Sequence, residues 1–526
     1  MNDDQRNLVL TGFMGTGKST IGRLVAAKLG RPFIDMDEVI VERAGMSIPE
    51  IFRRYGEAEF RRRERALCAE LSQQHGLVIA TGGGALVDPE NRATMAQSGC
   101  LVCLDCAEEE LLRRLHDDQG RPMLWGNDPA QRLRELLQAR RSAYAQIPYH
   151  IDTTHQTKEE SAAQVLRLYQ AQPKSWSVQT PTGNYYVHLI PGGLEYLGAL
   201  LRIQGVRNTV AVVSDEHVWP LYGDQVLSSL QQSDYKASAI VLPAGERYKT
   251  LETVRTLYDR FVEAELDRSG AVVALGGGVI TDMAGFAAAT FMRGVGLVQV
   301  PTTLLGMVDA SVGGKVAVDH PQGKNLIGAF VRPLFVLLDP ATLETLPEPE
   351  HRAGLAEVIK AGIIADPTLF AALEPPKALP AQRWLVERAL AVKIAVVEED
   401  PYERGRRAVL NLGHTFAHAF EVLANYKLAH GLAVSIGMVA AAYLAEEMGL
   451  CTSETRARIQ ATLAHHGLPI HYAEHPPKVI YQAMRTDKKR RGKKLRFILP
   501  REIGQVEIVS DIPPEKVHHA LERIRS

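Results

Sequence analysis

Short apolar runs alternate with helix-forming stretches along the first third of the chain. The runs at residues 8–10, 77–80 and 100–104 have the length of buried strands, and the stretch at 20–29 is typical of a helix. This alternation is expected of βαβ units, whose strands build a parallel sheet. An amphipathic stretch at 158–169, followed by the polar segment 172–175, predicts the end of this domain near residue 173.

The rest of the chain shows two further patterns. Apolar runs at 209–213 and 271–275 indicate a second α/β region, and long helical stretches dominate from about residue 350. A length of 526 residues also exceeds what one hydrophobic core usually supports. We therefore predict an α/β protein with a parallel-sheet domain over 1–172, a linker over 173–177, a Rossmann-like α/β part over 178–345 and a mostly α-helical part over 346–526.

Composition favours small molecules as partners over nucleic acid or membrane. The 60 Lys and Arg residues balance 61 Asp and Glu residues, so the chain lacks the basic excess of a nucleic-acid-binding protein. The longest apolar stretch, 271–292, is interrupted by glycines and Asp282 and is a poor membrane span. The polar first residues lead directly into the first apolar run and leave no room for a signal peptide, so we expect a cytoplasmic protein.

Five cysteines in a long chain without a signal peptide indicate reduced thiols rather than a disulfide framework. Cys100, Cys103 and Cys106 have the C-x₂-C-x₂-C spacing found in iron–sulfur proteins. The sequence around them is apolar, however, and in a strand Cys100 and Cys103 point to opposite faces. We favour a buried strand over an iron–sulfur cluster.

The first candidate site follows the apolar run at 8–10. The octapeptide GFMGTGKS at 12–19 fits the phosphate-loop pattern G-x-x-x-x-G-K-[ST]. Glycines let backbone N–H groups surround an anion, Lys18 can reach the β- and γ-phosphates, and Ser19 can ligate Mg²⁺ at a helix N-terminus. We predict a nucleoside triphosphate as the ligand of this loop.

Charged and glycine-rich segments follow the loop in a definite order. They are Asp35-Met36-Asp37 after an apolar run, Phe60-Arg61 and Glu64 on a charged helix, Thr81-Gly82-Gly83-Gly84 after a strand, Arg121-Pro122 in a polar loop, and Arg140 before Tyr144. In order and spacing these segments closely resemble shikimate kinase over residues 5–170. The chemistry agrees, because a small polyol carboxylate needs cationic anchors and an acidic group near its reactive hydroxyl.

By this resemblance the domain transfers a phosphoryl group from ATP to shikimate. The implied ATP-binding residues are Gly15, Thr16, Gly17, Lys18, Ser19, Thr20 and Arg114, and the implied shikimate-binding residues are Asp37, Arg61, Gly82, Gly83, Gly84 and Arg140. Ser19, and Asp35 through water, would hold Mg²⁺, while Lys18 and Arg121 would stabilise the transferred group. The family usually has Pro-Leu before Tyr144, and this departure leaves either Arg140 or Arg141 as the carboxylate anchor.

The second candidate site lies in the C-terminal half. The sequence LGGGV at 275–279 follows a strand and precedes a helix, which alone is a weak signal for a dinucleotide. The sequence NLGHTFAH at 411–418, with Glu357 and His430, supplies one carboxylate and two or three imidazoles, which suit a catalytic zinc with an open position. Helical spacing alone favours His414 and His418 as ligands, since they share one face.

This half also contains PAGERYK at 243–249, FMRG at 291–294, GGK at 313–315, GKN at 323–325 and AEVIK at 356–360. Together these motifs are similar to those of 3-dehydroquinate synthase, and the likeness extends from about residue 178 to the C-terminus. The resemblance implies that Glu357, His414 and His430 bind zinc or cobalt. It leaves His418 to the substrate and its phosphate.

That family converts the seven-carbon phosphate DAHP to 3-dehydroquinate and releases phosphate, with NAD⁺ consumed and regenerated in each turnover. The implied NAD-binding residues are Asp215, Glu246, Lys249, Gly277, Gly278, Asp282, Thr302, Thr303, Lys324 and Thr345. The implied DAHP-binding residues are Arg293, Asp309, Lys315, Asn325, Lys360, Lys393, Arg407, Asn411, His418 and Lys488. Of these, Lys315, Lys360, Arg407 and His418 are catalytic, Glu403 has a supporting role, and Thr281 stands where the family usually has glycine.

The basic run DKKRRGKK at 487–494 looks like a nucleic-acid patch when taken alone. The balanced overall charge lacks the wide basic surface that such binding needs. The resemblance instead brings one lysine of this run to the substrate. We favour Lys488 and predict that the rest of the run is a solvated loop.

We therefore predict a bifunctional chain that acts on shikimate, ATP and DAHP, uses NAD, Zn²⁺ and Mg²⁺, and forms a homodimer through its synthase part, as is common in that family. Two alternatives stay open. In the first, one domain is inactive and has a regulatory role. In the second, the C-terminal part cyclises another sugar phosphate or is a metal-dependent alcohol dehydrogenase. The set of arginines and lysines favours a phosphorylated substrate.

Overall fold

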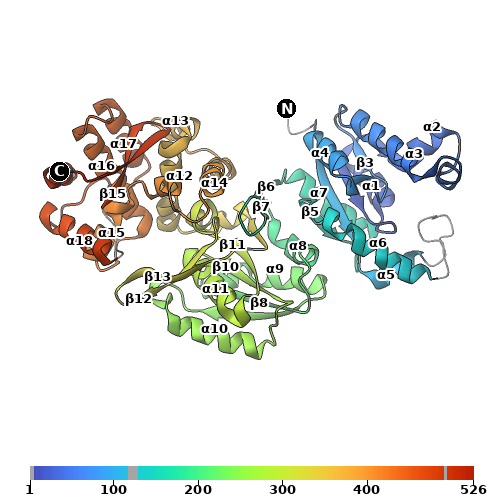
Figure 1. Ribbon diagram of the computed structural model, residues 1–526, viewed down its shortest axis with the longest axis horizontal. Helices are drawn as coiled ribbons and strands as arrows, with labels where there is room; N and C mark the ends of the chain where they lie inside the picture. Colours follow the sequence, from blue (N-terminus) through green and yellow to red (C-terminus); the bar gives the residue numbers. More distant parts are fainter. Residues whose placement is uncertain (1–4, 116–127, 491–494, 526) are drawn as a thin grey trace. The chain divides into compact units, whose positions relative to one another are not determined.

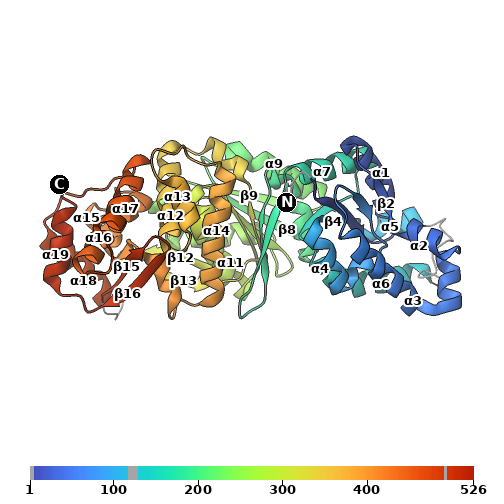
Figure 2. The ribbon, with the colours of Figure 1, turned by 90° about the horizontal axis from the view of Figure 1, so that it is seen from above.

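The computed structural model describes residues 5–115, 128–490 and 495–525 (Figures 1 and 2). The chain forms two compact units. The first comprises Met1–Ser175, Ile190–Val210 and Tyr222–Ala237, and the second comprises Trp176–Leu189, Ala211–Leu221 and Ser238–Ser526. None of the described helices is long and apolar enough to cross a membrane.

Unit 1 is built on a five-stranded parallel sheet with the order β2-β3-β1-β4-β5. Its strands are β1 (Asn7–Gly12), β2 (Phe33–Asp35), β3 (Val78–Ala80), β4 (Gly99–Asp105) and β5 (Tyr149–Asp152). Its helices include α1 (Lys18–Leu29), α2 (Met36–Ala44), α3 (Ile48–Leu71), α4 (Pro89–Ser98), α5 (Glu108–Leu115), α6 (Pro129–Tyr144) and α7 (Lys158–Gln170). The βαβ alternation predicted from the apolar runs is confirmed.

The central strands of this sheet are buried along their length, as expected for strands covered on both faces. Cys100 and Cys103 lie in β4 and are buried, so the prediction of a strand at this position is confirmed. Side chains from one face of the sheet, including Val9 and Leu101, join a core cluster with residues of α3 and α6. Capping boxes begin α3 (Ser47 with Glu50) and α7 (Thr157 with Glu160).

A second sheet of seven strands has the order β6-β7-β14-β11-β10-β8-β9. Its strands are β6 (Lys174–Val178), β7 (Tyr185–Leu189), β8 (Thr209–Asp215), β9 (Lys236–Leu242), β10 (Ala271–Gly276), β11 (Gly296–Pro301) and β14 (Phe335–Leu338). The helices along this stretch are α8 (Leu197–Ile203), α9 (Trp219–Gln232), α10 (Leu251–Glu263) and α11 (Gly278–Thr290). A hairpin of β12 (Lys315–His320) and β13 (Gly323–Phe330) extends beyond the sheet (Figure 1). The predicted second α/β part is thereby confirmed.

Helices dominate the chain after residue 347, as predicted. They are α12 (Glu348–Ala365), α13 (Pro367–Leu373), α14 (Gln382–Glu399), α15 (His414–Leu423), α16 (His430–Glu447), α17 (Ser453–His465), α18 (Pro477–Arg490) and α19 (Pro514–Arg523). Helix α16 is buried on most sides and packs against α12, α15, α17 and α19. A helix that is apolar all round is expected at such a central position.

Three local predictions differ from the structure. Most of the segment expected as a linker, 173–177, belongs to β6, because Trp176 and Val178 alternate with polar residues and pack against the core of unit 2. The hairpin of β15 (Arg496–Glu502) and β16 (Gln505–Ser510) was not predicted within the helical part. The basic run expected as a loop begins inside α18, which extends to Arg490.

Candidate active sites

The phosphate loop joins β1 to α1 in unit 1. Gly15 and Gly17 adopt φ angles of 84° and 92°, which glycine reaches without strain. Gly17 is the N-cap of α1, so the loop presents a helix N-terminus to an anion. Lys18 Nζ donates to the carbonyl oxygens of Gly12 (3.0 Å) and Phe13 (2.9 Å), which keeps the ammonium group at the loop.

A hydroxyl and a carboxylate with the ligand chemistry of Mg²⁺ meet at the start of α1. Ser19 Oγ donates to Asp35 Oδ2 at 2.6 Å. Asp35 also caps α2, because its Oδ1 accepts a hydrogen bond from the backbone nitrogen of Asp37 at 3.0 Å. Oxygen ligands of this kind suit Mg²⁺, which usually keeps several waters in its coordination shell. The structure thus brings together the two residues predicted to hold this ion.

The glycines that follow β3 lie directly against charged side chains of α2 and α3. A Cβ atom added to Gly82 would lie 2.7 Å from Asp37 Oδ1, and one added to Gly84 would lie 2.5 Å from Arg61 Nη1. Because glycine has no Cβ, the backbone and these side chains can border the same space. The predicted shikimate-binding residues of these three elements therefore occupy one site.

Arg140 and Arg141 have different environments at the end of α6. The Arg140 side chain is buried, and its Nη1 donates to the carbonyl oxygen of Gly83 at 3.0 Å. Tyr144 lies one turn later and donates its hydroxyl to the same oxygen at 2.5 Å. Arg141 is exposed. Of the two arginines, only Arg140 borders the glycine loop, and we retain it as the proposed carboxylate anchor.

Glu64 also belongs to this site, although no role was predicted for it. Its side chain is 1% exposed and accepts from Arg61 Nη1 at 2.5 Å. Burial raises the pKa of Glu64, and the charge of Arg61 opposes that shift. The carboxylate therefore orients the Arg61 guanidinium toward the site. The spacing of three residues between Arg61 and Glu64 on one helical face is the sequence signal that identifies such a pair.

Arg114 lies between the phosphate loop and the end of β5. Its Nη1 donates to the carbonyl oxygen of Gly15 at 3.3 Å, and its Nη2 donates to that of Thr153 at 2.7 Å. This position is the one expected for a residue that borders a nucleotide bound at the loop. Of the other predicted ATP-binding residues, Thr16 lies in the loop and Thr20 lies in the first turn of α1. The predicted lid residue Arg121 lies outside the described residues.

Unit 2 contains a cavity of about 1870 Å³ between the N-terminus of α11, the β12–β13 hairpin and the starts of α15 and α16. The predicted residues that line it are Asp215, Glu246, Lys249, Gly277, Gly278, Asp282, Thr303, Asp309, Lys315, Lys324, Asn325, Lys393, Arg407, Asn411, His414, His418 and His430. Sites for a single small molecule usually enclose about 300–1,000 Å³. A cavity of this size can therefore hold a dinucleotide and a substrate together.

Three side chains with metal-ligand chemistry meet beside this cavity. Glu357 on α12, His414 at the start of α15 and His430 at the start of α16 offer ligand atoms within 4.8 Å of one another. Glu357 Oε1 lies 3.9 Å from His414 Nε2 and 3.8 Å from His430 Nε2. That oxygen is buried and has no hydrogen-bond partner among the described residues. Two imidazoles and a carboxylate form a common set of protein ligands for catalytic zinc, so the donors present fit this ion.

The second nitrogen of each histidine faces a fixed acceptor. His414 Nδ1 donates to the carbonyl oxygen of Leu412 at 3.2 Å, and His430 Nδ1 lies 3.5 Å from Glu421 Oε1. These contacts leave both Nε2 atoms directed at Glu357, which is the usual orientation of metal-binding histidines. Burial lowers the pKa of His414, so its imidazole is neutral and its Nε2 lone pair is available.

Glu421 is a functional candidate that the sequence reasoning missed. Its side chain is 2% exposed and lies 3.1 Å from Lys324 Nζ as well as near His430. Burial acts to raise the pKa of Glu421, but His430 and Lys324 outweigh it and lower the pKa to about 2. One ionised carboxylate thus joins a metal-site histidine to a predicted NAD-binding lysine. Its position seven residues after His414 places both on one face of α15, but this spacing does not show that His430 and Lys324 meet that face.

We expect Glu421→Gln to weaken Zn²⁺ binding about 10-fold to 100-fold, the usual effect of losing a partner that orients a metal-binding histidine. Competition with a chromogenic chelator measures the affinity directly. The matched control is Glu447→Gln, because Glu447 also pairs with a histidine, His519, on the surface. Unchanged affinity in Glu421→Gln would show that the carboxylate does not position His430.

Three predicted substrate-binding lysines are each held by an acidic side chain, and a predicted arginine is held by backbone carbonyl oxygens. Lys360 pairs with Glu357, Lys393 Nζ lies 2.5 Å from Asp309 Oδ1, and Lys315 pairs with Glu403, which also accepts from Asn411. Arg407 is 1% exposed and donates to the carbonyl oxygens of Gly313 (3.1 Å) and Pro401 (2.5 Å). These contacts hold the cations in place before an anionic substrate arrives.

Cofactor and substrate residues meet at Lys249. Its Nζ lies 2.5 Å from Asp282 Oδ2 and 2.6 Å from Asn325 Oδ1. Asp282 and Lys249 were predicted at NAD and Asn325 at the substrate, so the two ligands would adjoin here. Gly277 is the N-cap of α11, and a helix N-terminus at the cavity suits a pyrophosphate.

Arg293, which was predicted to bind DAHP, does not line the cavity of its own chain. It is exposed and follows the C-terminal end of α11, whose N-terminus lines the cavity. A helix of 13 residues separates the two ends by about 20 Å. Motif order could not reveal this separation, because sequence distance along one helix does not show which end faces the ligand.

Three other residues predicted to bind DAHP or NAD do not line the cavity either: Lys360, Thr302 and Thr345. Thr302 is buried and its backbone nitrogen donates to the carbonyl oxygen of Gly276, and the Thr345 hydroxyl donates to Thr342. Lys488 lies in α18, and its side chain is outside the described part. Thr281, the departure from the usual glycine, is buried within α11 and donates its hydroxyl to the Gly278 carbonyl oxygen at 3.1 Å. The extra side chain is therefore accommodated inside the helix.

Comparison with family models identifies three matching segments. Residues 14–170 match shikimate kinase, residues 239–353 match the N-terminal part of 3-dehydroquinate synthase, and residues 354–490 match its C-terminal part. A 3-dehydroquinate synthase from Synechococcus sp. is 45% identical over 359 residues, which cover 66% of this chain and 98% of the relative. One from Cyanothece sp. is 46% identical over 361 residues, with the same coverage.

Solved structures give similar matches. The 2-epi-5-epi-valiolone synthase from Streptomyces hygroscopicus, with NAD⁺ and Zn²⁺ bound, is 30% identical with a TM-score of 0.60, and the match covers 66% of this chain and 99% of that one. A shikimate kinase from Acinetobacter baumannii in complex with shikimate is 40% identical over 31% of this chain and 93% of that one, with a TM-score of 0.31.

Proposed function

Because the chain belongs to the 3-dehydroquinate synthase family and carries a shikimate kinase domain at residues 14–170, we propose that both of its sites are active. Unit 1 phosphorylates shikimate with ATP and Mg²⁺, and unit 2 converts DAHP to 3-dehydroquinate with NAD and Zn²⁺ or Co²⁺. Both reactions belong to chorismate and aromatic amino acid biosynthesis. The observation that carries the proposal most directly is the meeting of Glu357, His414 and His430 beside a cavity lined by the predicted cofactor and substrate residues.

The kinase site offers charged and polar groups that complement both ATP and shikimate. Lys18 and the N-terminus of α1 face the phosphates, and Ser19 with Asp35 would hold Mg²⁺ at the same loop. Phosphoryl transfer depends mainly on position and charge stabilisation, which these groups supply. Asp37, beside Gly82, would accept hydrogen bonds from the ring hydroxyls of shikimate, and Arg61 would bind its carboxylate.

We expect Arg140→Ala to raise KM for shikimate about 10-fold to 100-fold, since a hydrogen bond to a charged group contributes about 1.5–3 kcal/mol. Arg141→Ala is the matched control, because Arg141 is the adjacent, exposed arginine of α6. Initial rates at varied shikimate and saturating ATP measure the effect. A larger effect in Arg141→Ala than in Arg140→Ala would reverse the assignment.

The synthase site combines cations, a metal-ligand set and a helix N-terminus. A bound zinc ion would acidify a substrate hydroxyl as a Lewis acid, and NAD⁺ would accept the hydride. Lys315, Lys393 and Arg407 would bind the anionic groups of DAHP, including the phosphate that leaves. His418 lines the cavity and is not part of the Glu357, His414 and His430 set, and it would exchange a proton with the substrate or its phosphate.

A second candidate function for unit 2 is cyclisation of a different sugar phosphate, or simple alcohol oxidation. The lysines and arginines that line the cavity favour the first of these over the second, because they suit a phosphorylated substrate. The test follows NADH absorbance and free phosphate together after DAHP is added. We expect stoichiometric phosphate without net NADH. Accumulating NADH would identify a dehydrogenase, and no reaction with DAHP would indicate another sugar phosphate.

We also propose that the protein is a cytoplasmic homodimer assembled through its synthase part. The position of Arg293 is consistent with a dimer, because a DAHP-binding role for this exposed residue, which does not line the cavity of its own chain, requires the cavity of another copy. We expect sedimentation velocity to give twice the chain mass of 57.9 kDa. A single species of one chain mass at micromolar concentration would contradict the dimer.

A further inference from the structure

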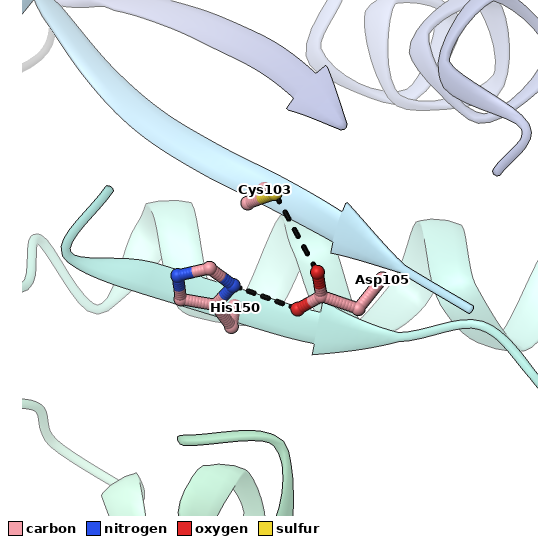
Figure 3. A group of neighbouring side chains, drawn as sticks. All are labelled: Cys103, Asp105 and His150. Carbon is pink, nitrogen blue, oxygen red and sulfur yellow. Dashed lines mark hydrogen bonds and ion pairs between the residues drawn. The ribbon is translucent and has the colours of Figure 1, made fainter. Parts of the chain in front are cut away.

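Three side chains with metal-ligand chemistry lie together in unit 1 (Figure 3). Cys103 and Asp105 are two residues apart on β4, and His150 is paired with Cys103 on the neighbouring strand β5. All three therefore project from one face of the sheet. A sulfur, an oxygen and a nitrogen ligand atom lie within 4.8 Å of one another. Cys103 and His150 are buried, while the Asp105 side chain is 19% exposed and connects the cluster to solvent.

Both ring nitrogens of His150 face acceptor oxygens. Nε2 lies 2.9 Å from the carbonyl oxygen of Ile147, and Nδ1 lies 2.7 Å from Asp105 Oδ2. A carbonyl oxygen can only accept, so Nε2 carries a hydrogen. In a neutral imidazole the lone pair of Nδ1 would then point at a carboxylate oxygen, which is repulsive. This repulsion is removed when a proton lies between the two atoms, or when a metal cation binds both of them at about 2.0–2.2 Å each and holds them slightly farther apart.

The surroundings favour a metal cation. The hydrogen bond from Nε2 to a backbone carbonyl is the contact that usually orients a metal-binding histidine. Thiolate, imidazole and carboxylate are all ligands of zinc. Thr11, which pairs with Cys103 across β1 and β4, has a buried hydroxyl with no hydrogen-bond partner among the described residues. A water in the fourth coordination position could give this hydroxyl a partner.

We propose that Cys103, Asp105 and His150 form a second site for a divalent transition metal of the zinc or cobalt class. The site is separate from the Glu357, His414 and His430 set, and it contains a sulfur ligand that the latter lacks. Without metal, burial raises the pKa of the Cys103 thiol, and its Sγ lies 3.6 Å from Asp105 Oδ1. Metal binding would release to solvent both the thiol proton and the proton between His150 Nδ1 and Asp105, and it would replace the thiol contact with a metal–sulfur bond.

The site would stabilise the edge of the sheet that carries the nucleotide side of the kinase. The backbone oxygen of Asp105 accepts from Thr153 N at 2.8 Å and from Thr153 Oγ1 at 2.9 Å. The Thr153 carbonyl in turn accepts from Arg114, one of the residues predicted to bind ATP. A metal held by Asp105 would therefore fix the strand ends on which Arg114 rests.

Cobalt titration of the full-length, metal-stripped protein tests the proposal, because a thiolate bound to Co²⁺ gives a charge-transfer band that oxygen and nitrogen ligands do not. We expect two equivalents bound per chain, with this band present. Cys103→Ser should lose the band and one equivalent, and His150→Gln should do the same. His414→Ala should lose the other equivalent and keep the band, which separates this site from the synthase metal.

Binding of a single equivalent without the band would overturn the proposal and identify His150 and Asp105 as a protonated pair. A band that persists in Cys103→Ser would also overturn it, since another cysteine would then be the ligand. Circular dichroism of each variant confirms that a lost band does not reflect unfolding, and shikimate phosphorylation by Cys103→Ser checks that unit 1 is intact.

Discussion

Lys18→Ala is expected to lower kcat for shikimate phosphorylation about 10³-fold, the upper range for loss of one group that stabilises developing charge. Lys18 is held at the phosphate loop by two carbonyl oxygens, and it can shift to the β- and γ-phosphates when ATP binds. A coupled assay of ADP formation at saturating ATP and shikimate measures the effect. Phosphate release from DAHP by the same variant should be unchanged, because Lys18 belongs to the other unit.

The matched control is Lys28→Ala, which removes an exposed lysine in the last turn of the same helix. It should leave kcat for shikimate unchanged within a factor of two or so, as is usual for surface substitutions. If Lys18→Ala kept most of its kinase activity, the loop would not be the site of phosphoryl transfer.

His414→Ala is expected to abolish tight Zn²⁺ binding at the Glu357, His414 and His430 site and to lower kcat/KM for DAHP at least about 10³-fold. The reason is that Lewis-acid stabilisation contributes several kcal/mol, and each 1.4 kcal/mol is a factor of ten. Zinc content after dialysis and phosphate release from DAHP are measured on the same sample. Phosphorylation of shikimate serves as the internal control for folding and concentration.

His418→Ala discriminates between the two ligand sets considered for this metal. Helical spacing alone pairs His414 with His418, whereas the structure directs the Nε2 atoms of His414 and His430 to Glu357. We expect His418→Ala to lose activity with DAHP and to retain the zinc of this site. Loss of that zinc in His418→Ala, with retention in His430→Ala, would restore the pair given by helical spacing.

The local sequence pattern was sufficient to predict a site that is built from one loop and the strand before it. The octapeptide 12–19 predicts the phosphate loop, and the structure places Ser19 beside Asp35 although 16 residues separate them. Parallel strands end at the same sheet edge, so residues that follow them gather there. The same rule brings Asp37 to the glycines after β3.

Contacts that depend on packing between distant elements could not be predicted in this way. Glu421 reaches both His430 and Lys324 because α15, α16 and the β12–β13 hairpin meet, and no spacing in the sequence encodes that meeting. The place of Arg293 outside its own chain's cavity could not be predicted either, since its motif is close to the cofactor motif in sequence but lies at the other end of α11. A pairing of β4 with β5 was also needed to bring His150 to Cys103.

Phosphorus NMR of the full-length protein tests most directly whether one chain carries both activities. The sample contains DAHP, NAD⁺, Zn²⁺, shikimate, ATP and Mg²⁺, and each substrate is omitted in turn. We predict inorganic phosphate that requires DAHP and a shikimate phosphate resonance that requires ATP, each at an unchanged rate when the other substrate is left out. If either signal stayed at background, the corresponding site would be inactive or would act on another substrate, and the account of that unit would be wrong.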